Sequence, residues 1–167
     1  IVYFDEAIGL DPGGAAAYKD RGKTYLQLGR NEQAIQDLDR AIGANAQDPE
    51  AYLLRAQVHF NLERYQRSIH DLDRALDLDR FYSQAYRLRG DSYSGLGKAL
   101  QARYDYVRAA RTEALPGDPQ KLKAVIHQGP QDAKNYNTRG LAYLSIGEFE
   151  RAIQDFNEST RAMWDFS

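Results

Sequence analysis

The chain has 167 residues, of which 28% are charged, and its formal net charge is −2 with acidic and basic residues interleaved. This balance argues against a nucleic-acid-binding protein, which needs clustered positive charge. No apolar run reaches the ~20 residues that a membrane-spanning helix requires. The absence of cysteine excludes disulfides and thiolate ligands, and it is compatible with the cytoplasm, which we expect, or with the periplasm.

One residue pattern recurs four times along the chain. Its anchors are the tyrosines Tyr18, Tyr52, Tyr86 and Tyr136. Each anchor is followed by an arginine after three residues, by a small residue after four and by alanine or serine after sixteen. The first three anchors are 34 residues apart and the last step is 50 residues. A fixed period of this length is typical of stacked helical hairpins, which bury their apolar faces against one another.

Each copy of the pattern predicts two helices. Apolar and small residues fall at i, i+4 and i+7, the spacing of one helix face. Gly29, Gly97 and Gly147 stand where a left-handed cap would end the first helix. Small residues such as Gly22 and Ala34 allow the two helix axes of a hairpin to approach closely.

The predicted elements follow in chain order. Residues 1–12 resemble the end of a preceding, truncated repeat, because Phe4 and Ala7 precede Leu38 and Ala41 by one period. The four hairpins, called hairpins 1 to 4 below, occupy residues 13–47, 48–81, 82–115 and 132–165. An insert at 116–131 separates the last two.

The insert, with its flanks at roughly 112–131, carries its own start and stop signals. Asp118-Pro119 favours the beginning of a short helix and Gly129-Pro130 its end, with Leu122, Val125 and Ile126 on one side. This predicts the back half of a repeat whose front half is lost, so that the stack bends or hairpin 4 docks at an altered angle. The alternative is a tolerated surface insertion.

The pattern Tyr-x2-Arg-Gly-x2-Tyr…Ala-x3-Leu-x2-Ala, at period 34, resembles the tetratricopeptide repeat. The family's usual tryptophan is tyrosine here, and its closing proline is present as Pro12 and Pro130 but replaced by Ala46 and Arg80 elsewhere. The resemblance implies an all-α fold, a right-handed α-α superhelix of about four hairpins. It also implies a concave face lined by the first helix of each pair.

No residue spacing in the chain predicts catalysis, a cofactor or a metal site, so we expect a protein that is not an enzyme. His59 occupies a slot that is tyrosine in the other copies, which predicts a buried packing residue. His70 and His127 are isolated, and no HxxxH or HExxH spacing occurs.

An aspartate stands nineteen residues after every anchor, and it matches the recurring arginine. The four predicted ion pairs are Arg21–Asp37, Arg55–Asp71, Arg89–Asp105 and Arg139–Asp155. The alternative pairs each aspartate with the following arginine. Either arrangement predicts a structural role at a helix seam.

The predicted partner-binding groove lies on the first helices of hairpins 1 to 3. It mixes apolar side chains with charges, which suits a protein or peptide segment with an acidic or phosphorylated stretch. Its residues are Lys19, Lys23, Leu53, Leu54, Gln57, Phe60, Arg87, Leu88 and Asp91.

Family members that bind chaperones hold a terminal carboxylate with a set of Lys, Asn and Arg residues. Of the corresponding positions in this chain, Lys19, Lys23, Leu54, Gln84 and Leu88, one alone matches, namely Lys19, so that mode of binding is not expected. We therefore predict a non-catalytic adaptor or scaffold that binds a peptide or protein segment in its groove. The alternatives are a scaffold that self-assembles through exposed ends around Tyr3, Phe4 and Ile8, and the regulatory repeat domain of a larger enzyme.

Overall fold

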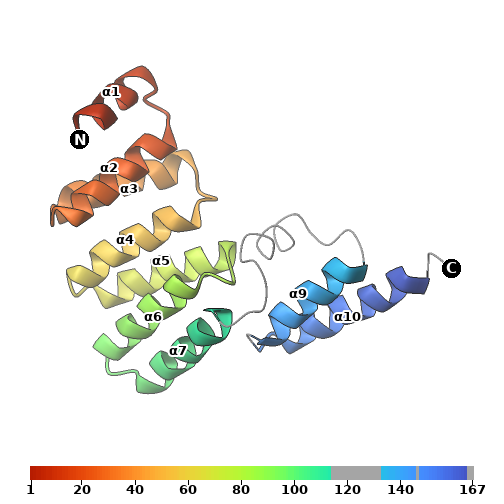
Figure 1. The fold of residues 1–167 in the computed structure, drawn as a ribbon. Helices are drawn as coiled ribbons and strands as arrows, with labels where there is room; N and C mark the ends of the chain where they lie inside the picture. Colours follow the sequence, from red (N-terminus) through yellow and green to blue (C-terminus); the bar gives the residue numbers. More distant parts are fainter. Residues whose placement is uncertain (114–132, 146, 165–167) are drawn as a thin grey trace. The chain divides into compact units, whose positions relative to one another are not determined.

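The computed structural model describes residues 1–113, 133–145 and 147–164, and every regular element in these ranges is an α-helix (Figure 1). The expected insert helix with Leu122, Val125 and Ile126 lies outside the described residues. The chain divides into two compact units, Ile1–Tyr106 and Val107–Ser167, and α7 contributes residues to both.

The first unit is a stack of helical hairpins. Each helix packs against the next from α1 to α6, and the first helices of neighbouring hairpins also touch, α2 against α4 and α4 against α6. This order follows from the period, because each hairpin buries its remaining apolar face on the next one. The helices are α1 (Val2–Leu10), α2 (Ala15–Gln27), α3 (Asn31–Ala44), α4 (Pro49–Asn61), α5 (Tyr65–Leu78), α6 (Ser83–Gly95) and α7 (Ala99–Glu113).

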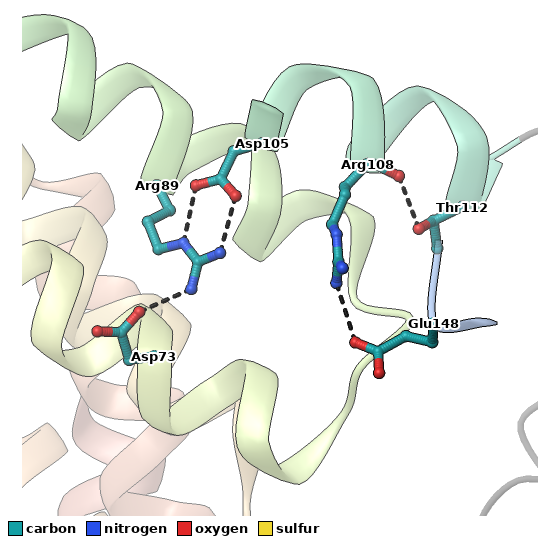
Figure 2. A network of polar contacts seen from close by, with 6 residues as sticks. All are labelled: Asp73, Arg89, Asp105, Arg108, Thr112 and Glu148. Carbon is teal, nitrogen blue, oxygen red and sulfur yellow. Dashed lines mark hydrogen bonds and ion pairs between the residues drawn. The ribbon is translucent and has the colours of Figure 1, made fainter. Parts of the chain in front are cut away.

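The second unit contains hairpin 4, in which α9 (Ala133–Ser145) packs along α10 (Phe149–Trp164). The C-terminal half of α7 also belongs to this unit, where the Arg108 side chain pairs with Glu148 at 3.2 Å (Figure 2). Thr112 donates a hydrogen bond of 2.8 Å to the backbone carbonyl of Arg108, within the same helix.

The turns between paired helices share one backbone conformation. Gly29, Gly97 and Gly147 have φ values of 69°, 71° and 80°, so the predicted left-handed caps are confirmed. In hairpin 2 the same place is taken by Glu63, with φ of 55°. The next amide closes the turn in the same way, since Arg64 N bonds His59 O at 2.8 Å as Arg30 N bonds Tyr25 O at 2.9 Å.

Small residues set the distance between the two helices of each hairpin. A Cβ atom added to Gly22 would lie 2.9 Å from Leu38, one added to Gly90 would lie 2.6 Å from the Tyr106 ring, and one added to Gly140 would lie 2.7 Å from the Phe156 ring. Hairpin 2 carries Ala56 and Leu72 at these positions, and both are fully buried. The seam therefore admits only a glycine where the facing residue is the large ring of Tyr106 or Phe156, whereas facing leucines accompany glycine in hairpin 1 and alanine in hairpin 2.

Candidate partner-binding surface

The recurring arginine and aspartate form a bidentate ion pair in all four hairpins, as the first of the two predicted arrangements required. The Arg Nε and Nη2 atoms donate to the two carboxylate oxygens at 2.7 and 2.8 Å in hairpin 1, 2.9 and 2.6 Å in hairpin 2, 2.8 and 2.7 Å in hairpin 3, and 2.7 Å twice in hairpin 4. The aspartates are nearly inaccessible, with side chains 1–5% exposed. A carboxylate this buried requires a bonded cation, and the planar guanidinium supplies both bonds.

A second acidic residue, from the preceding helix pair, completes each arginine site in the first unit. The Nη1 atom of Arg55 donates to Asp39 at 2.7 Å, and that of Arg89 donates to Asp73 at 2.7 Å (Figure 2). Arg21 donates to Asp5 of α1 in the same way. Helix α1 therefore supplies the acidic contact that the second helix of the preceding hairpin supplies to Arg55 and Arg89. Sequence reasoning missed this series, although the recurring Asp-Leu-Asp at 37–39 and 71–73 carried the signal.

Each of these arginines also lies over the tyrosine that anchors its repeat. The guanidinium carbon is 5.8 Å from the ring centroid of Tyr18 or Tyr52, 5.5 Å from that of Tyr86 and 6.0 Å from that of Tyr136. The bonds with Asp37 raise the pKa of Arg21. For Arg55 and Arg89, burial by itself lowers the pKa, but the bonded aspartates raise it overall. These three arginines therefore stay protonated, and their charges have a structural role.

The basic end of the predicted groove is compensated by acids of the next hairpin. Lys19 Nζ lies 2.8 Å from both Asp48 and Glu50, and Lys23 Nζ lies 3.2 Å from Glu50. The pKa of Glu50 is lowered, first by its hydrogen bond to Lys19 and then by that to Lys23, against the effect of burial. An acidic partner must therefore compete with Glu50. In the sequence, the acids Asp48 and Glu50 at the start of α4 were the feature that could have indicated this pairing.

The apolar residues predicted for the groove do not all face one way. Leu53 and Phe60 are half-buried, and Phe60 makes an edge contact with the Tyr65 ring, centroid to centroid 5.6 Å. Leu54 packs against the core formed by Ala34, Leu38 and Val58. Leu88 is 7% exposed and presents almost no surface to a partner.

The reason lies in the helix positions that face the preceding hairpin. Ser92 is fully buried and its hydroxyl lies 2.9 Å from that of Ser68 on α5, which fixes this side of α6. Leu88 is one turn before Ser92, so it belongs to the same stripe. Leu54 stands one turn before the buried Val58 in the same relation. In hairpins 2 and 3, the position two residues after the anchor therefore serves packing and not partner binding.

The remaining polar groove residues are held within their own hairpins or lie at the surface. Gln57 donates to Asn61 at 3.0 Å, and Asp91 accepts a hydrogen bond of 2.8 Å from the Tyr106 hydroxyl. Arg87 is exposed on α6. Together with Leu53 and Phe60, these side chains leave a mixed surface on α4 and α6.

His59 is a core residue, as its slot predicted, with 8% of its surface exposed. Its pKa is lowered chiefly by burial, which the charge of Asp71 opposes and three arginines reinforce. Within the described residues, no three His, Cys, Asp or Glu side chains are grouped so that they could hold a metal ion. Nor does any helix in those ranges have the length and apolar character needed to cross a bilayer.

Comparison with solved structures finds the same fold in several repeat proteins. MamA is 23% identical with a TM-score of 0.58, over 97% of this chain and 85% of that chain. YrrB, a repeat protein with an unusual peptide-binding site, is 19% identical with a TM-score of 0.56, over 97% and 93%. The second repeat domain of Spaghetti (RPAP3), bound to the HSP90 peptide SRMEEVD, is 32% identical with a TM-score of 0.54, over 55% and 85%.

No curated protein matches the chain. Its sequence does match the tetratricopeptide repeat family over residues 3–51, 19–83 and 53–119, and again over 133–162. These matches span most of the chain and agree with the paired helices and with the recurring arginine, glycine and tyrosine positions. The protein belongs to the tetratricopeptide repeat family.

Proposed function

We propose that this protein is a non-catalytic interaction module that binds a peptide segment across α2, α4 and α6. The observation that supports the proposal is the contact of these three first helices with one another, α2 with α4 and α4 with α6. Leu53 and Phe60 supply half-buried apolar contacts on α4, the middle of the three helices, flanked by Lys19, Lys23, Arg87 and Asp91. Apolar centres with polar rims are the usual anatomy of such interfaces.

A terminal-carboxylate mode like that of chaperone-binding relatives is not proposed. RPAP3 domains bind HSP90 and HSP70 peptides that end in EEVD. Here Lys19 alone matches the set of donors for such a carboxylate, and Lys19 is already paired with Asp48 and Glu50. An internal peptide segment fits this surface better, if one of its acidic side chains replaces Glu50 as the ion-pair partner of the lysines.

The experiment is selection from a random peptide display library, followed by titration of a fluorescent copy of the selected peptide. Leu53→Ala with Phe60→Ala should weaken binding by about 2 kcal/mol or more, because central apolar contacts dominate such interfaces. Gln36→Ala, on the exposed side of α3, is the matched control and should leave affinity unchanged. Unchanged affinity in a folded double variant would place binding on another face. The labelled peptide SRMEEVD should not bind.

A second candidate, self-assembly, is favoured by the exposure of apolar side chains on α1. Val2, Tyr3 and Leu10 are 68%, 84% and 89% exposed. Exposed apolar clusters favour association with a second copy. Light scattering over a concentration series tests this, and a mass that stays monomeric at every concentration argues against it. Tyr3→Glu should abolish any association that occurs through α1.

A further inference from the structure

A cavity of about 380 Å³ opens at the seam between α6 and α7, within the first unit. None of its residues belongs to the groove proposed on α2, α4 and α6. Its volume lies in the range of about 300–1,000 Å³ that is typical of ligand sites, so it has room for an apolar side chain of a peptide. The lining residues are Arg89, Tyr93, Leu100, Gln101, Tyr104 and Asp105.

Two exposed apolar side chains distinguish this cavity from the same place in the other hairpins. Leu100 and Tyr104 lie one turn apart on α7 and are 82% and 57% exposed. The two positions hold polar residues in every other copy of the repeat, namely Glu32 and Gln36, Gln66 and His70, and Glu150 and Gln154. The repeat fold does not require apolar residues there, so its own packing does not account for them.

The stacking of hairpins does not account for Leu100 and Tyr104 either. Helix α4 packs on α3 and α6 packs on α5, so hairpins 1 and 2 are both covered by the next hairpin. The side chains at the two positions are nevertheless exposed in both, namely Glu32, Gln36, Gln66 and His70. These positions therefore face solvent in a complete stack. Neighbouring apolar side chains at such positions indicate a contact surface for another molecule.

The ion pair of hairpin 3 gives the cavity a fixed and charge-compensated wall (Figure 2). Arg89 donates two hydrogen bonds to Asp105, at 2.8 and 2.7 Å, and a third to Asp73 at 2.7 Å. Tyr93 is half-buried, and burial raises the pKa of its hydroxyl, which therefore stays neutral. Because the charges of this wall are already paired, the cavity suits an uncharged apolar group better than an ion.

The charges that flank the apolar pair are positive. Arg103 directly precedes Tyr104 and stands one turn after Leu100 on α7, and Lys98 stands two residues before Leu100. Both side chains are exposed, and neither makes an ion pair within residues 1–113, 133–145 and 147–164. A second copy that docked through the same face would bring like charges together, whereas an acidic segment would compensate them.

We propose that the hairpin 3 cavity is a second docking site, which takes a leucine or phenylalanine side chain from an acidic segment of a partner protein. This side chain lies against Leu100, Tyr104 and Tyr93, and the removal of their apolar surface from water favours binding. Acidic residues beside it pair with Lys98 and Arg103, which speeds association and disfavours basic segments. The site is independent of the groove and goes beyond the function proposed for it.

The test is selection from a display library of random peptides that have leucine or phenylalanine fixed at the centre. The intact chain with Leu53→Ala and Phe60→Ala is the target, so that peptides specific for the groove are not retained. We expect the selected peptides to carry Asp or Glu beside the fixed residue. Titration of fluorescent copies then compares variants. Leu100→Gln with Tyr104→His, the residues of hairpin 2, should weaken binding at least about tenfold, because central apolar contacts dominate such interfaces.

The matched control is Glu32→Gln with Gln36→His, which places the same two residues in hairpin 1 and should leave affinity unchanged. Lys98→Gln with Arg103→Gln should slow association and reduce its salt dependence. A library that yields no peptide sensitive to the hairpin 3 variant, or equal losses in the control, would overturn the proposal. Neutral or basic selected peptides would overturn the acidic partner. A mass that rises with concentration in light scattering, and that the hairpin 3 variant abolishes, would assign the face to a second copy instead.

Discussion

Arg55 donates a hydrogen bond of 2.7 Å to Asp39, which lies near the middle of α3 in the preceding hairpin. Its other two donors hold Asp71 of its own hairpin. One guanidinium therefore fastens two hairpins, and its two acidic partners differ sharply in exposure. The Asp39 side chain is 54% exposed, while that of Asp71 is 3% exposed.

This difference predicts unequal effects of removing the two acids. Asp71→Ala should lower the free energy of unfolding by about 3–5 kcal/mol, because it strands a partly buried arginine. Asp39→Ala should cost about 0–1 kcal/mol, because solvent screens the outer pair. Urea denaturation monitored by circular dichroism measures both. Equal losses for the two variants would show that burial does not decide the strength of these pairs.

The glycine at the seam of hairpin 3 predicts a second stability effect. Gly90→Ala places a Cβ 2.6 Å from the Tyr106 ring and should cost about 1–3 kcal/mol by overpacking. Adding Tyr106→Leu should recover most of that loss, since hairpin 2 already combines Ala56 with Leu72. Gly43→Ala is the control, because its Cβ would meet nothing within 4 Å, and it should be neutral or stabilising. Thermal unfolding of these three variants and of the unchanged protein measures the effects.

The turn of hairpin 2 offers a stabilising change. Glu63 has φ of 55°, a region that disfavours side chains, whereas the three equivalent turns have glycine. Glu63→Gly should raise the unfolding free energy by a few tenths to about 1 kcal/mol, with strain relief exceeding the entropy cost. The reciprocal variant Gly97→Glu should lower it by a similar amount. A destabilised Glu63→Gly protein would mean that the glutamate side chain contributes more than its backbone costs.

His59 predicts a specific pH dependence of stability. Its pKa is lowered in the folded state, chiefly by burial, so the unfolded chain binds the proton first as the pH falls. The stabilising contribution is therefore full above the unfolded pKa of about 6.5 and is lost as pH falls through the folded value. His59→Tyr, the residue of the equivalent slot in the other hairpins, should reduce the fall in melting temperature between about pH 7.5 and pH 5. Scans in phosphate-free buffer measure it, and parallel profiles for both proteins would exclude the histidine as the cause.

Contacts within one repeat were predictable from sequence. The period placed the paired helices, the glycine turns and the ion pair between Arg55 and Asp71, because residues at fixed positions of a helical hairpin meet in every copy. The burial of His59 followed from the tyrosines in its equivalent slots. Such inferences need the helical period and the repeat alignment and nothing else.

Contacts between hairpins were harder to predict, because they depend on the rotation from one repeat to the next. The pairing of Lys19 with Glu50, the burial of Leu88 and the bond from Arg55 to Asp39 all belong to this class. A cavity at the seam of α4 and α5, lined in part by His59, Arg67 and His70, was missed for another reason. His59, Arg67 and His70 are spread over two helices, and no short motif joins them.

The bridges formed by Asp5, Asp39 and Asp73 use the same positions at every step of the first unit. If residues 48–81, one whole period, were removed, Asp39 would be as far from Arg89 along the chain as Asp73 is now. The joint would then be rebuilt by residues already present. Deleting or duplicating 34 residues leaves this network of ion pairs intact. The number of stacked hairpins can therefore change by whole repeats without a compensating substitution.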